Sequence, residues 1–312
     1  MRVLNLVTNN DSRFYEQQVS QLAARGVEQT TLEVPGRRTY ANGETSERSL
    51  ASYARLYPRV LGASFGDYDL VHANYGLTAP HAVLQPNLPV VVSLWGSDLM
   101  GEYGWLSKLC ARFADETIVM SPEMAEVLGD HARVIPHGVD LEQFHPKPRE
   151  TAREQLGWRT DARHVLFPYP PERGVKDHPR AERVATAADE RLDVAVVFHS
   201  VTGVPHEQMP TYMNAADSLL VTSRREGSPN AVKEALACNL PIVSTDVGDV
   251  ADRLDGVTRL RVCSCDDWLH TALVNVLRAG ERSNGREVAR EVSVDRMSQQ
   301  LLDVYREVVD DE

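Results

Sequence analysis

Short apolar runs alternate with stretches in which apolar residues recur every three or four positions, and this pattern continues along most of the chain. The apolar runs of the first half predict strands at residues 2–7, 30–34, 69–72, 89–94, 116–120 and 133–136. The helical spacing between them predicts helices at residues 13–25, 47–64, 77–84, 102–113 and 123–128. Pro58 falls inside the second helix, where we expect a kink or a break.

The second half repeats the pattern after residues 137–149, a segment rich in proline and charge that is typical of a linker between domains. Its apolar runs predict strands at residues 164–169, 193–198, 218–222, 241–244 and 259–262. Its helices are predicted at residues 180–190, 209–215, 230–237, 250–254, 266–279 and 295–309. We therefore expect an α/β protein of two Rossmann-like domains that face a cleft, with ligands beyond the carboxyl ends of the strands.

Composition narrows the class of partner. A chain of 312 residues with 42% hydrophobic and 25% charged residues fits two soluble domains with proper cores. The net charge of -12 argues against nucleic acid as a partner and against broad adhesion to anionic membranes. The pair Arg37-Arg38 still allows a small local basic patch.

The four cysteines point to a reduced environment. Cys110 and Cys238 lie in apolar helical patterns and are expected in the core, while Cys263 and Cys265 lack nearby Cys or His partners and make a poor zinc site. The first residues turn polar too soon for a signal peptide, and no apolar run approaches the roughly 20 residues of a spanning helix. We therefore expect a cytoplasmic protein, and peripheral contact with the inner face of the membrane stays open.

The most informative segment is residues 223–244, SRREGSPNAVKEALACNLPIVS. Glu226 ends a loop, and Glu234 follows inside a predicted helix after seven intervening residues. Ser228 is placed to cap this helix, and Pro229 suits its first turn. A helix start at the carboxyl end of a parallel sheet favours anions, and carboxylates accept hydrogen bonds from hydroxyl groups. A site for phosphate plus polyol indicates a sugar nucleotide.

This segment resembles the Glu-x7-Glu motif of the family-4 retaining glycosyltransferases, which have the GT-B fold. Residues 214–217, Asn-Ala-Ala-Asp, and residues 244–249 also match that family. The alternative is an ordinary capped helix whose glutamates face solvent. The resemblance implies a hexosyltransferase-type enzyme of polysaccharide biosynthesis that transfers a sugar, with retention, from a UDP- or GDP-linked donor to a glycan or lipid-linked acceptor. It implies no cofactor and no metal ion, because no Asp-x-Asp motif stands suitably at a strand end.

The resemblance also implies roles in the donor site. Glu226 binds hydroxyls of the donor sugar and Glu234 binds the ribose. Arg173 and Lys176, which match the family's cations, stabilise the departing diphosphate, because fixed cations at a metal-free site must take its growing charge. A solvated loop is the rival interpretation of residues 167–177. The predicted catalytic residues are Arg173, Lys176 and Glu226, and the predicted donor-binding residues are Gly227, Ser228, Pro229, Asn230, Ala231 and Glu234.

The acceptor side is expected in the first half. Residues 89–98 resemble the family's strand that ends in His-Gly-x-Asp, with Trp95 in place of the histidine. Trp95 fits either the face of a sugar or the core. Gly96 allows close approach of a ligand to the backbone, and Asp98 is expected to orient a hydroxyl or to cap the next helix.

Two further loops carry acceptor-side candidates. Asn9 and Asn10 occupy a turn in which the family has two glycines, and both tolerate unusual backbone angles. His137 replaces an asparagine in a segment, residues 134–144, that resembles the family's entry into the donor domain. His72 and His81 are candidates to face the cleft, although lone histidines are more often structural.

The resemblance implies three parts of the chain. Residues 1–145 form the acceptor-side domain, residues 146–290 form the donor domain, and the helix within residues 291–312 packs back on the first domain. After the strand at residues 193–198 the family has a Gly-rich turn, a helix and a further strand, which this chain lacks. We therefore expect a donor domain shortened by one βα unit of about 30 residues.

Two alternatives to the transferase remain. An epimerase or hydrolase of nucleotide sugars on the same fold would share the donor motifs. A non-catalytic sugar-nucleotide-binding subunit is compatible with the missing glycine pair, Trp95 and the shortened domain. A dinucleotide dehydrogenase is disfavoured, because no Gly-x-Gly-x-x-Gly follows Val7 or Tyr169. The sequence does not specify the oligomeric state, the base or the sugar.

Overall fold

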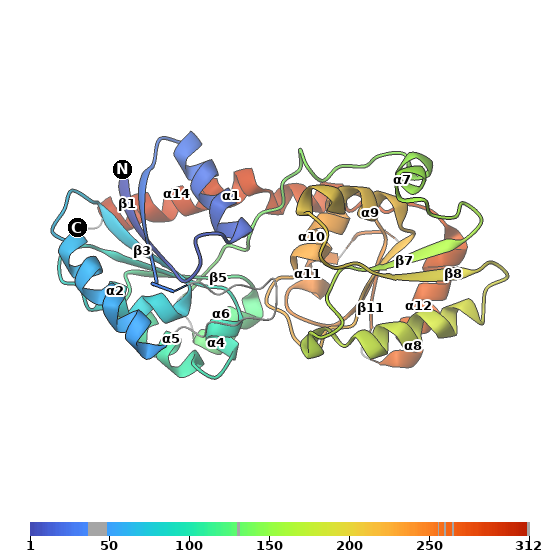
Figure 1. Cartoon of the computed structure of the whole chain (residues 1–312), viewed down its shortest axis with the longest axis horizontal. Coiled ribbons are helices and arrows are strands. Elements are labelled where there is room, and N and C mark those ends of the chain that lie inside the picture. The colour runs from blue at the N-terminus through green and yellow to red at the C-terminus, as the bar shows by residue number, and fades with distance from the viewer. Residues whose placement is uncertain (37–48, 130–131, 255, 259, 264, 311–312) are drawn as a thin grey trace. The chain divides into compact units, whose positions relative to one another are not determined.

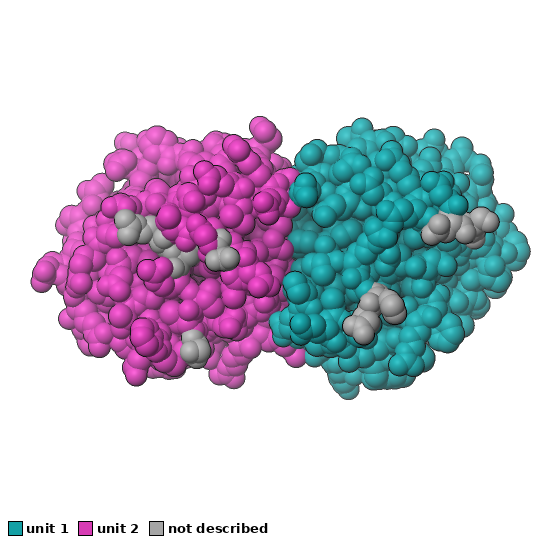
Figure 2. Space-filling view, turned by 180° about the vertical axis from the view of Figure 1, so that it is seen from behind, with its two compact units in different colours: residues 1–138, 294–312 teal, residues 139–293 magenta. Residues whose placement is uncertain are grey.

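The computed structural model describes the chain except for residues 37–48, 130–131, 255, 259, 264 and 311–312. The basic pair Arg37-Arg38 therefore lies outside the described residues. The chain divides into two compact units, Met1–Gly138 with Val294–Glu312 (unit 1) and Val139–Ser293 (unit 2) (Figure 2). Among the described residues, each helix is either too short or too polar to cross a membrane.

Unit 1 contains a six-stranded parallel sheet in the order β2-β1-β3-β4-β5-β6. Its strands are β1 (Arg2–Val7), β2 (Glu28–Glu33), β3 (Leu70–Asn74), β4 (Val90–Leu94), β5 (Glu116–Val119) and β6 (Arg133–Val134). Every residue of β3 and β4 is buried, as expected for central strands covered on both faces. The predicted strands of this half are thus present, with small shifts at their ends.

The helices of unit 1 cover both faces of this sheet. They are α1 (Arg13–Ala24), α2 (Leu50–Ala63), α3 (Ala79–Val83), α4 (Ser97–Met100), α5 (Gly104–Ala111), α6 (Pro122–Leu128) and α14 (Val294–Asp310). Helices α1 and α14 pack together on one side of the sheet, and α2 and α5 lie on the other (Figure 1). Helix α2 continues through Pro58, so the helix does not break there. A proline removes one backbone hydrogen bond, and the remaining turns hold this helix together.

His72 belongs to the core of unit 1. Its ring lies between the Tyr305 hydroxyl, 2.6 Å from Nδ1, and the Ser93 hydroxyl, 2.8 Å from Nε2. Complete burial lowers the pKa of His72 to about 3, so the ring is neutral near pH 7. Because Tyr305 is part of α14, this contact fixes the C-terminal helix in the core of unit 1.

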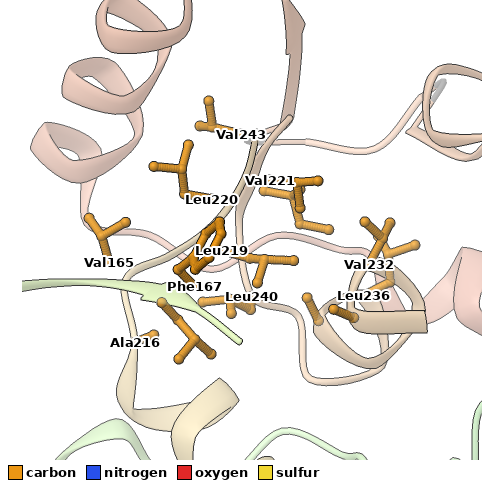
Figure 3. Packing of buried hydrophobic residues seen from close by; sticks show 14 of the residues in the cluster. Val165, Phe167, Ala216, Leu219, Leu220, Val221, Val232, Leu236, Leu240 and Val243 are labelled. Atoms are coloured by element: carbon orange, nitrogen blue, oxygen red, sulfur yellow. The ribbon is translucent and has the colours of Figure 1, made fainter. Parts of the chain in front are cut away.

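Unit 2 contains a five-stranded parallel sheet in the order β11-β10-β9-β7-β8. Its strands are β7 (Arg163–Phe167), β8 (Val196–Ser200), β9 (Ser218–Val221), β10 (Ile242–Thr245) and β11 (Leu260–Cys263). Its helices are α7 (Arg149–Leu156), α8 (His178–Asp189), α9 (Met209–Ala215), α10 (Asn230–Ala237), α11 (Val250–Leu254), α12 (Asp266–Ala279) and α13 (Arg286–Ala289). Figure 3 shows Phe167 and Leu219 of the sheet near Val232 and Leu236 of α10, so the core positions this helix.

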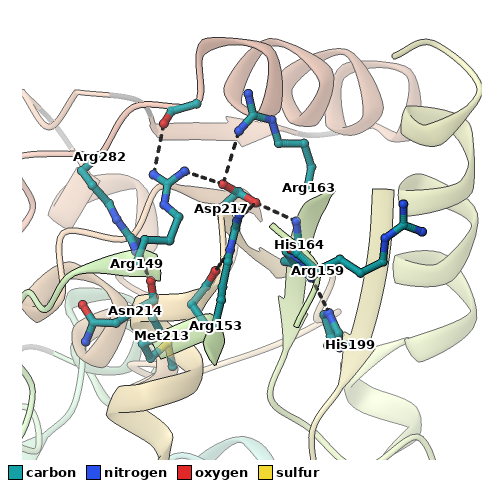
Figure 4. A network of polar contacts seen from close by, with 12 residues as sticks. Arg149, Arg153, Arg159, Arg163, His164, His199, Met213, Asn214, Asp217 and Arg282 are labelled. Atoms are coloured by element: carbon teal, nitrogen blue, oxygen red, sulfur yellow. Dashed lines mark hydrogen bonds and ion pairs between the residues drawn. The ribbon is translucent and has the colours of Figure 1, made fainter. Parts of the chain in front are cut away.

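The amino-terminal edge of this sheet is held by a buried carboxylate, that of Asp217, whose side chain is 1% exposed (Figure 4). It accepts hydrogen bonds from Arg149 at 2.7 Å, Arg153 at 2.6 Å and the backbone N–H of His164 at 2.7 Å. Arg149 also donates to the carbonyl of Gly280, at the end of α12. One carboxylate therefore ties together α7, β7, β9 and α12.

Candidate functional site

Helix α10 starts at the carboxyl-terminal edge of the unit 2 sheet, after the loop that follows β9. Its first residue is Asn230, and Pro229 stands at the N-cap with an extended backbone (φ −70°, ψ 118°). The prediction that Ser228 caps the helix and Pro229 forms its first turn is therefore wrong by one residue, because the extended ψ of Pro229 keeps it outside the helix. The Ser228 hydroxyl is buried and has no hydrogen-bond partner among the described residues.

The loop before α10 is packed tightly against the turn after β10. A methyl group added at Gly248 would lie 2.2 Å from the carbonyl oxygen of Gly227. Gly248 also has a positive φ of 56°, which other residues rarely adopt. This close approach fixes the path of the backbone between Glu226 and Ala231 at the start of the helix.

Lys176 and Glu226 meet in a partly buried ion pair, although they come from different loops. Lys176 lies in the turn after β7, and its ammonium group donates to the Glu226 carboxylate. The same carboxylate oxygen accepts a hydrogen bond of 2.6 Å from the Ser223 hydroxyl. The Glu226 side chain keeps 12% of its surface exposed, so this end of the pair still faces solvent.

The surroundings of Lys176 explain its electrostatics. The side chain is buried, and its ammonium lies 4.0 Å from the centre of the Tyr169 ring. Burial lowers the pKa of Lys176 below its ordinary value, and the neighbouring Glu226 carboxylate partly offsets this shift. Burial likewise raises the pKa of Tyr169, whose hydroxyl has no hydrogen-bond partner among the described residues.

Glu234 lies on the buried side of α10 and contacts His206. The Nε2–H of His206 donates to the Glu234 carboxylate at 2.9 Å. The side-chain amide of Gln143 donates to the other ring nitrogen, Nδ1, at 3.2 Å. Because Nδ1 accepts a hydrogen bond, the proton of the neutral ring is on Nε2. The carboxylate therefore stands in a fixed orientation beside the segment that links β8 to α9.

The two predicted cations of the turn after β7 differ in their setting. Arg173 is exposed, whereas Lys176 is buried. The turn is fastened to the end of β9, since the N–H of Arg224 donates to the Val175 carbonyl at 2.9 Å and the Thr222 hydroxyl to the Lys176 carbonyl at 3.0 Å. The rival interpretation of a solvated loop therefore fits Arg173 and does not fit Lys176.

Two of the acceptor-side candidates, Trp95 and His137, contact each other in unit 1. Their ring centres are 4.7 Å apart in an edge-to-face arrangement, and His137 also stacks on Phe14 at 4.9 Å. The indole N–H of Trp95 is buried without a hydrogen-bond partner among the described residues. Gly96 follows with a φ of 123°. These rings form one aromatic cluster at the carboxyl ends of the unit 1 strands.

The Asp98 carboxylate binds backbone N–H groups of the neighbouring loops. It accepts hydrogen bonds from the backbone N–H groups of Gly76 at 2.8 Å, Trp95 at 2.9 Å and Gly96 at 2.8 Å. Burial raises the pKa of Asp98, and these backbone donors partly counter that effect. Asp98 lies within α4 and holds the turn that carries Trp95, so capping of the helix at residues 102–113 is not its role.

The two asparagines after β1 lie in a separate loop. Asn9 accepts a hydrogen bond of 3.2 Å from the N–H of Asp11. Asn10 lines an open pocket of about 340 Å³, whose other lining residues include Thr31, Glu33 and Arg59. His81, in contrast, is mostly buried, and its Nε2–H donates to the Tyr53 carbonyl at 2.9 Å.

Sequence reasoning missed several residues that contact the predicted ones. These are Phe14, Tyr169, His206 and Ser223. Tyr169 and Ser223 each stand two residues beyond a strand end, which is a usable signal in a parallel fold. His206 carries no such signal, because its contact with Glu234 spans 28 residues and arises from packing. Among the described residues, no group of three or more His, Cys, Asp or Glu is arranged to hold a metal ion.

Known proteins resemble both halves of the chain. The family description Glycosyltransferase Family 4 matches residues 5–143, and Glycosyl transferases group 1 matches residues 174–278. TuaC of Bacillus subtilis, named as a teichuronic acid biosynthesis glycosyltransferase, is 29% identical over 213 residues, which cover 59% of this chain and 54% of TuaC. The chain thus spans about half the length of that relative.

Solved structures share the fold. Sucrose-phosphate synthase from Thermosynechococcus elongatus is 18% identical, with full coverage of both chains and a TM-score of 0.78. HepE of Anabaena in complex with UDP-glucose is 17% identical, with 98% of this chain and all of that chain covered and a TM-score of 0.71. The two sheets and their helices therefore have the GT-B fold that the sequence predicted. With both halves matched, the chain belongs to the group 1, family 4 glycosyltransferases.

Proposed function

We propose that this protein transfers a sugar from a nucleotide-diphosphate donor to a glycan or lipid-linked acceptor, with retention of the anomeric configuration. The observation that carries the proposal is the meeting of Lys176 and Glu226 beside the start of α10. A cation and a carboxylate from different loops provide, at one place, partners for a phosphate and for hydroxyl groups. HepE, which shares the fold, was solved with UDP-glucose, and this supports a nucleotide sugar as the donor.

We assign each of these side chains a separate role in binding the donor. Lys176, with the exposed Arg173, stabilises the charge that grows on the departing diphosphate, assisted by the backbone N–H groups of Asn230 and Ala231. Lys176 exchanges its contact with Glu226 for the phosphate, and Glu226 is then available to the sugar hydroxyls. In this proposal, side chains rather than a metal ion or cofactor neutralise the leaving group.

Glu234 is proposed to bind the ribose hydroxyls. Its carboxylate is one turn inside α10 and is oriented by His206. One of its oxygens already accepts from His206, and the acceptor capacity of a carboxylate allows further bonds to hydroxyls. On the acceptor side, Trp95, which packs edge-to-face on the buried His137 and is itself partly exposed, is proposed to stack on the apolar side of a sugar ring.

A binding experiment tests the donor site. Melting temperatures of the wild-type protein are measured with UDP, GDP and UDP-glucose, and then repeated with Glu234→Ala and Glu226→Ala. We expect Glu234→Ala to weaken nucleotide and nucleotide sugar alike, and Glu226→Ala to lose only the contribution of the sugar. Glu190→Ala, an exposed change at the far end of α8, is the matched control. Equal melting shifts in all four proteins would refute the assigned roles.

A product experiment separates the transferase from its alternatives. The protein is incubated with UDP-glucose and a panel of sugar and lipid-linked acceptors, and products are read by NMR. A glycosidic product with the anomeric configuration of the donor supports the proposal. Free UDP with an altered or released sugar, formed without any acceptor, would instead favour an epimerase or hydrolase. Binding without any turnover would favour a non-catalytic subunit.

A further inference from the structure

Tyr169 carries a polar group that the fold itself does not use. The residue follows strand β7 by two positions and is 7% exposed. Its hydroxyl is buried and has no hydrogen-bond partner among the described residues. A buried polar group without a partner destabilises the folded state, and native proteins contain few of them. The presence of this hydroxyl therefore needs a reason other than stability.

Packing alone does not require a hydroxyl at this position. The ring lies edge-to-face on Phe167, with the ring centres 5.2 Å apart, and belongs to the apolar core of unit 2. A phenylalanine would make the same ring contacts without burying an unpaired hydroxyl. The backbone carbonyl of Tyr169 accepts a hydrogen bond of 3.3 Å from the Ser200 hydroxyl, so the loop is held in place without the phenol group.

The position of the ring places the hydroxyl in the proposed donor site. The Lys176 ammonium lies 4.0 Å from the centre of the ring and also contacts the Glu226 carboxylate. Burial has the largest effect on the pKa of Tyr169 and raises it, and the negative charges of Glu226 and Glu234 raise it further, while Arg173 lowers it. The hydroxyl is therefore protonated near pH 7, able to donate, and close enough to both glutamates to feel their charge.

The group that this hydroxyl would meet follows from its surroundings. In the proposed function Glu226 binds the sugar and Glu234 binds the ribose, and the diphosphate is the part of the donor that joins the two. The contact of Lys176 with both the ring and Glu226 puts Tyr169 on the side of the phosphate that carries the sugar. Phosphate oxygens are strong acceptors, and a hydrogen bond to an ionised acceptor is stronger than one between neutral groups.

We propose that the Tyr169 hydroxyl donates a hydrogen bond to the sugar-bearing phosphate of the donor. The inference rests on the proposed function and adds a residue to its donor site. The hydroxyl is buried while Lys176 contacts Glu226, and the proposed transfer of Lys176 to the phosphate frees space beside the ring. Lys176 then supplies charge, and Tyr169 supplies a neutral donor, to the same phosphate.

Titration calorimetry of the full-length protein with UDP and UMP tests the proposal, because UMP lacks the second phosphate. Tyr169→Phe removes the hydroxyl and keeps the ring. We expect this variant to bind UDP about 10- to 100-fold more weakly, the usual effect of losing one hydrogen bond to a charged group, and to bind UMP within about twofold of the wild-type protein. GDP and GMP replace UDP and UMP if the wild-type protein prefers GDP.

The melting temperature without nucleotide separates binding from structure. For Tyr169→Phe it should stay the same or rise, since the variant removes an unpaired buried group. Tyr15→Phe is the matched control, because Tyr15 in unit 1 is 1% exposed and its hydroxyl lies 2.5 Å from the Thr31 hydroxyl. Loss of this paired hydroxyl should lower the melting temperature and leave UDP binding unchanged.

Three results would overturn the inference. If Tyr169→Phe binds UDP as tightly as the wild-type protein while Lys176→Ala does not, the proposed donor site stands without Tyr169. If Tyr169→Phe weakens UDP and UMP equally, or lowers the melting temperature as much as Tyr15→Phe, the hydroxyl has a structural role. If the wild-type protein binds neither UDP nor GDP, the proposed function fails together with this inference.

Discussion

Two carboxylates, one at the amino-terminal and one at the carboxyl-terminal ends of the strands of the unit 2 sheet, show how one fold uses the same chemical group in two ways. Asp217, at the amino-terminal edge, is 1% exposed and accepts from two arginines and a backbone N–H. Glu226, at the carboxyl-terminal edge, is 12% exposed and accepts from one lysine and one serine. Both stand in segments that match the family, but only the second keeps a side open to solvent. A motif residue is therefore assigned a role by its surroundings rather than by its presence in the motif.

The largest expected effect is on stability at the amino-terminal edge. Asp217→Asn removes the only carboxylate that Arg149 and Arg153 contact in ion pairs among the described residues. Leaving buried charges without a partner costs about 3–5 kcal/mol, so we expect the free energy of unfolding in urea to fall by about that amount. Asp161→Asn is the control, since its pair with Arg159 is fully exposed to solvent and contributes little to stability. If both variants lost the same free energy of unfolding, the buried Asp217 carboxylate would have no special role in stability.

At the carboxyl-terminal edge the effect falls on catalysis. If Lys176 stabilises the leaving group, Lys176→Ala should lower kcat by about 10²–10³-fold, the usual result of removing one such electrostatic contact. Lys147→Ala, a change of the same type elsewhere in unit 2, should leave kcat within about twofold. Steady-state kinetics with a nucleotide sugar measures both. A Lys176→Ala enzyme with wild-type kcat would show that the ion pair with Glu226 is structural, like that of Asp217.

The expected change of nucleotide affinity with pH is smaller than the effect of Lys176→Ala on kcat. Burial lowers the pKa of Lys176 below 10.5, the ordinary value for lysine, so its ammonium group is deprotonated at a lower pH than that of an exposed lysine. Binding that needs the charged form is therefore present below the shifted pKa and is lost as pH rises through it. We expect nucleotide affinity, measured by titration calorimetry, to fall about tenfold on that alkaline limb. Lys176→Arg should move the limb to higher pH, and an unchanged limb would contradict the assignment.

The smallest effect is expected at Ser223. Its hydroxyl donates to the Glu226 oxygen that also contacts Lys176. Ser223→Ala should raise the Kd of the sugar nucleotide by about five- to tenfold, equivalent to about 1.0–1.4 kcal/mol, within the usual net contribution of one hydrogen bond, and should leave unfolding nearly unchanged. Ser200→Ala, at the end of β8, serves as the comparison. If Ser223→Ala destabilised the fold and left binding intact, Glu226 would resemble Asp217 after all.

Many elements were predicted accurately because their signals are local. Helices α9, α10, α11 and α12 have the bounds that apolar spacing predicted, and Gly280 ends α12 in the left-handed conformation that glycine favours. Short helices were missed. Helices α4 and α13 have four residues each, too few for a helical period to be visible. The cap of α10 was misplaced by one residue, at Ser228 instead of Pro229, because the backbone angle of Pro229 depends on the loop around it.

The sequence by itself determined the alternation of strands and helices, the parallel α/β class and the segment that holds Glu226 and Glu234. These follow from spacing within a few residues, where periodicity and propensity act. Tertiary structure decided the partners: Lys176 with Glu226 across 50 residues, and Arg153 with Asp217 across 64. It also decided that Asp98 holds a turn. Such pairings depend on which loops the strand order brings together and on how deeply each charge is buried. Neither property can be predicted from the spacing of residues within a short segment.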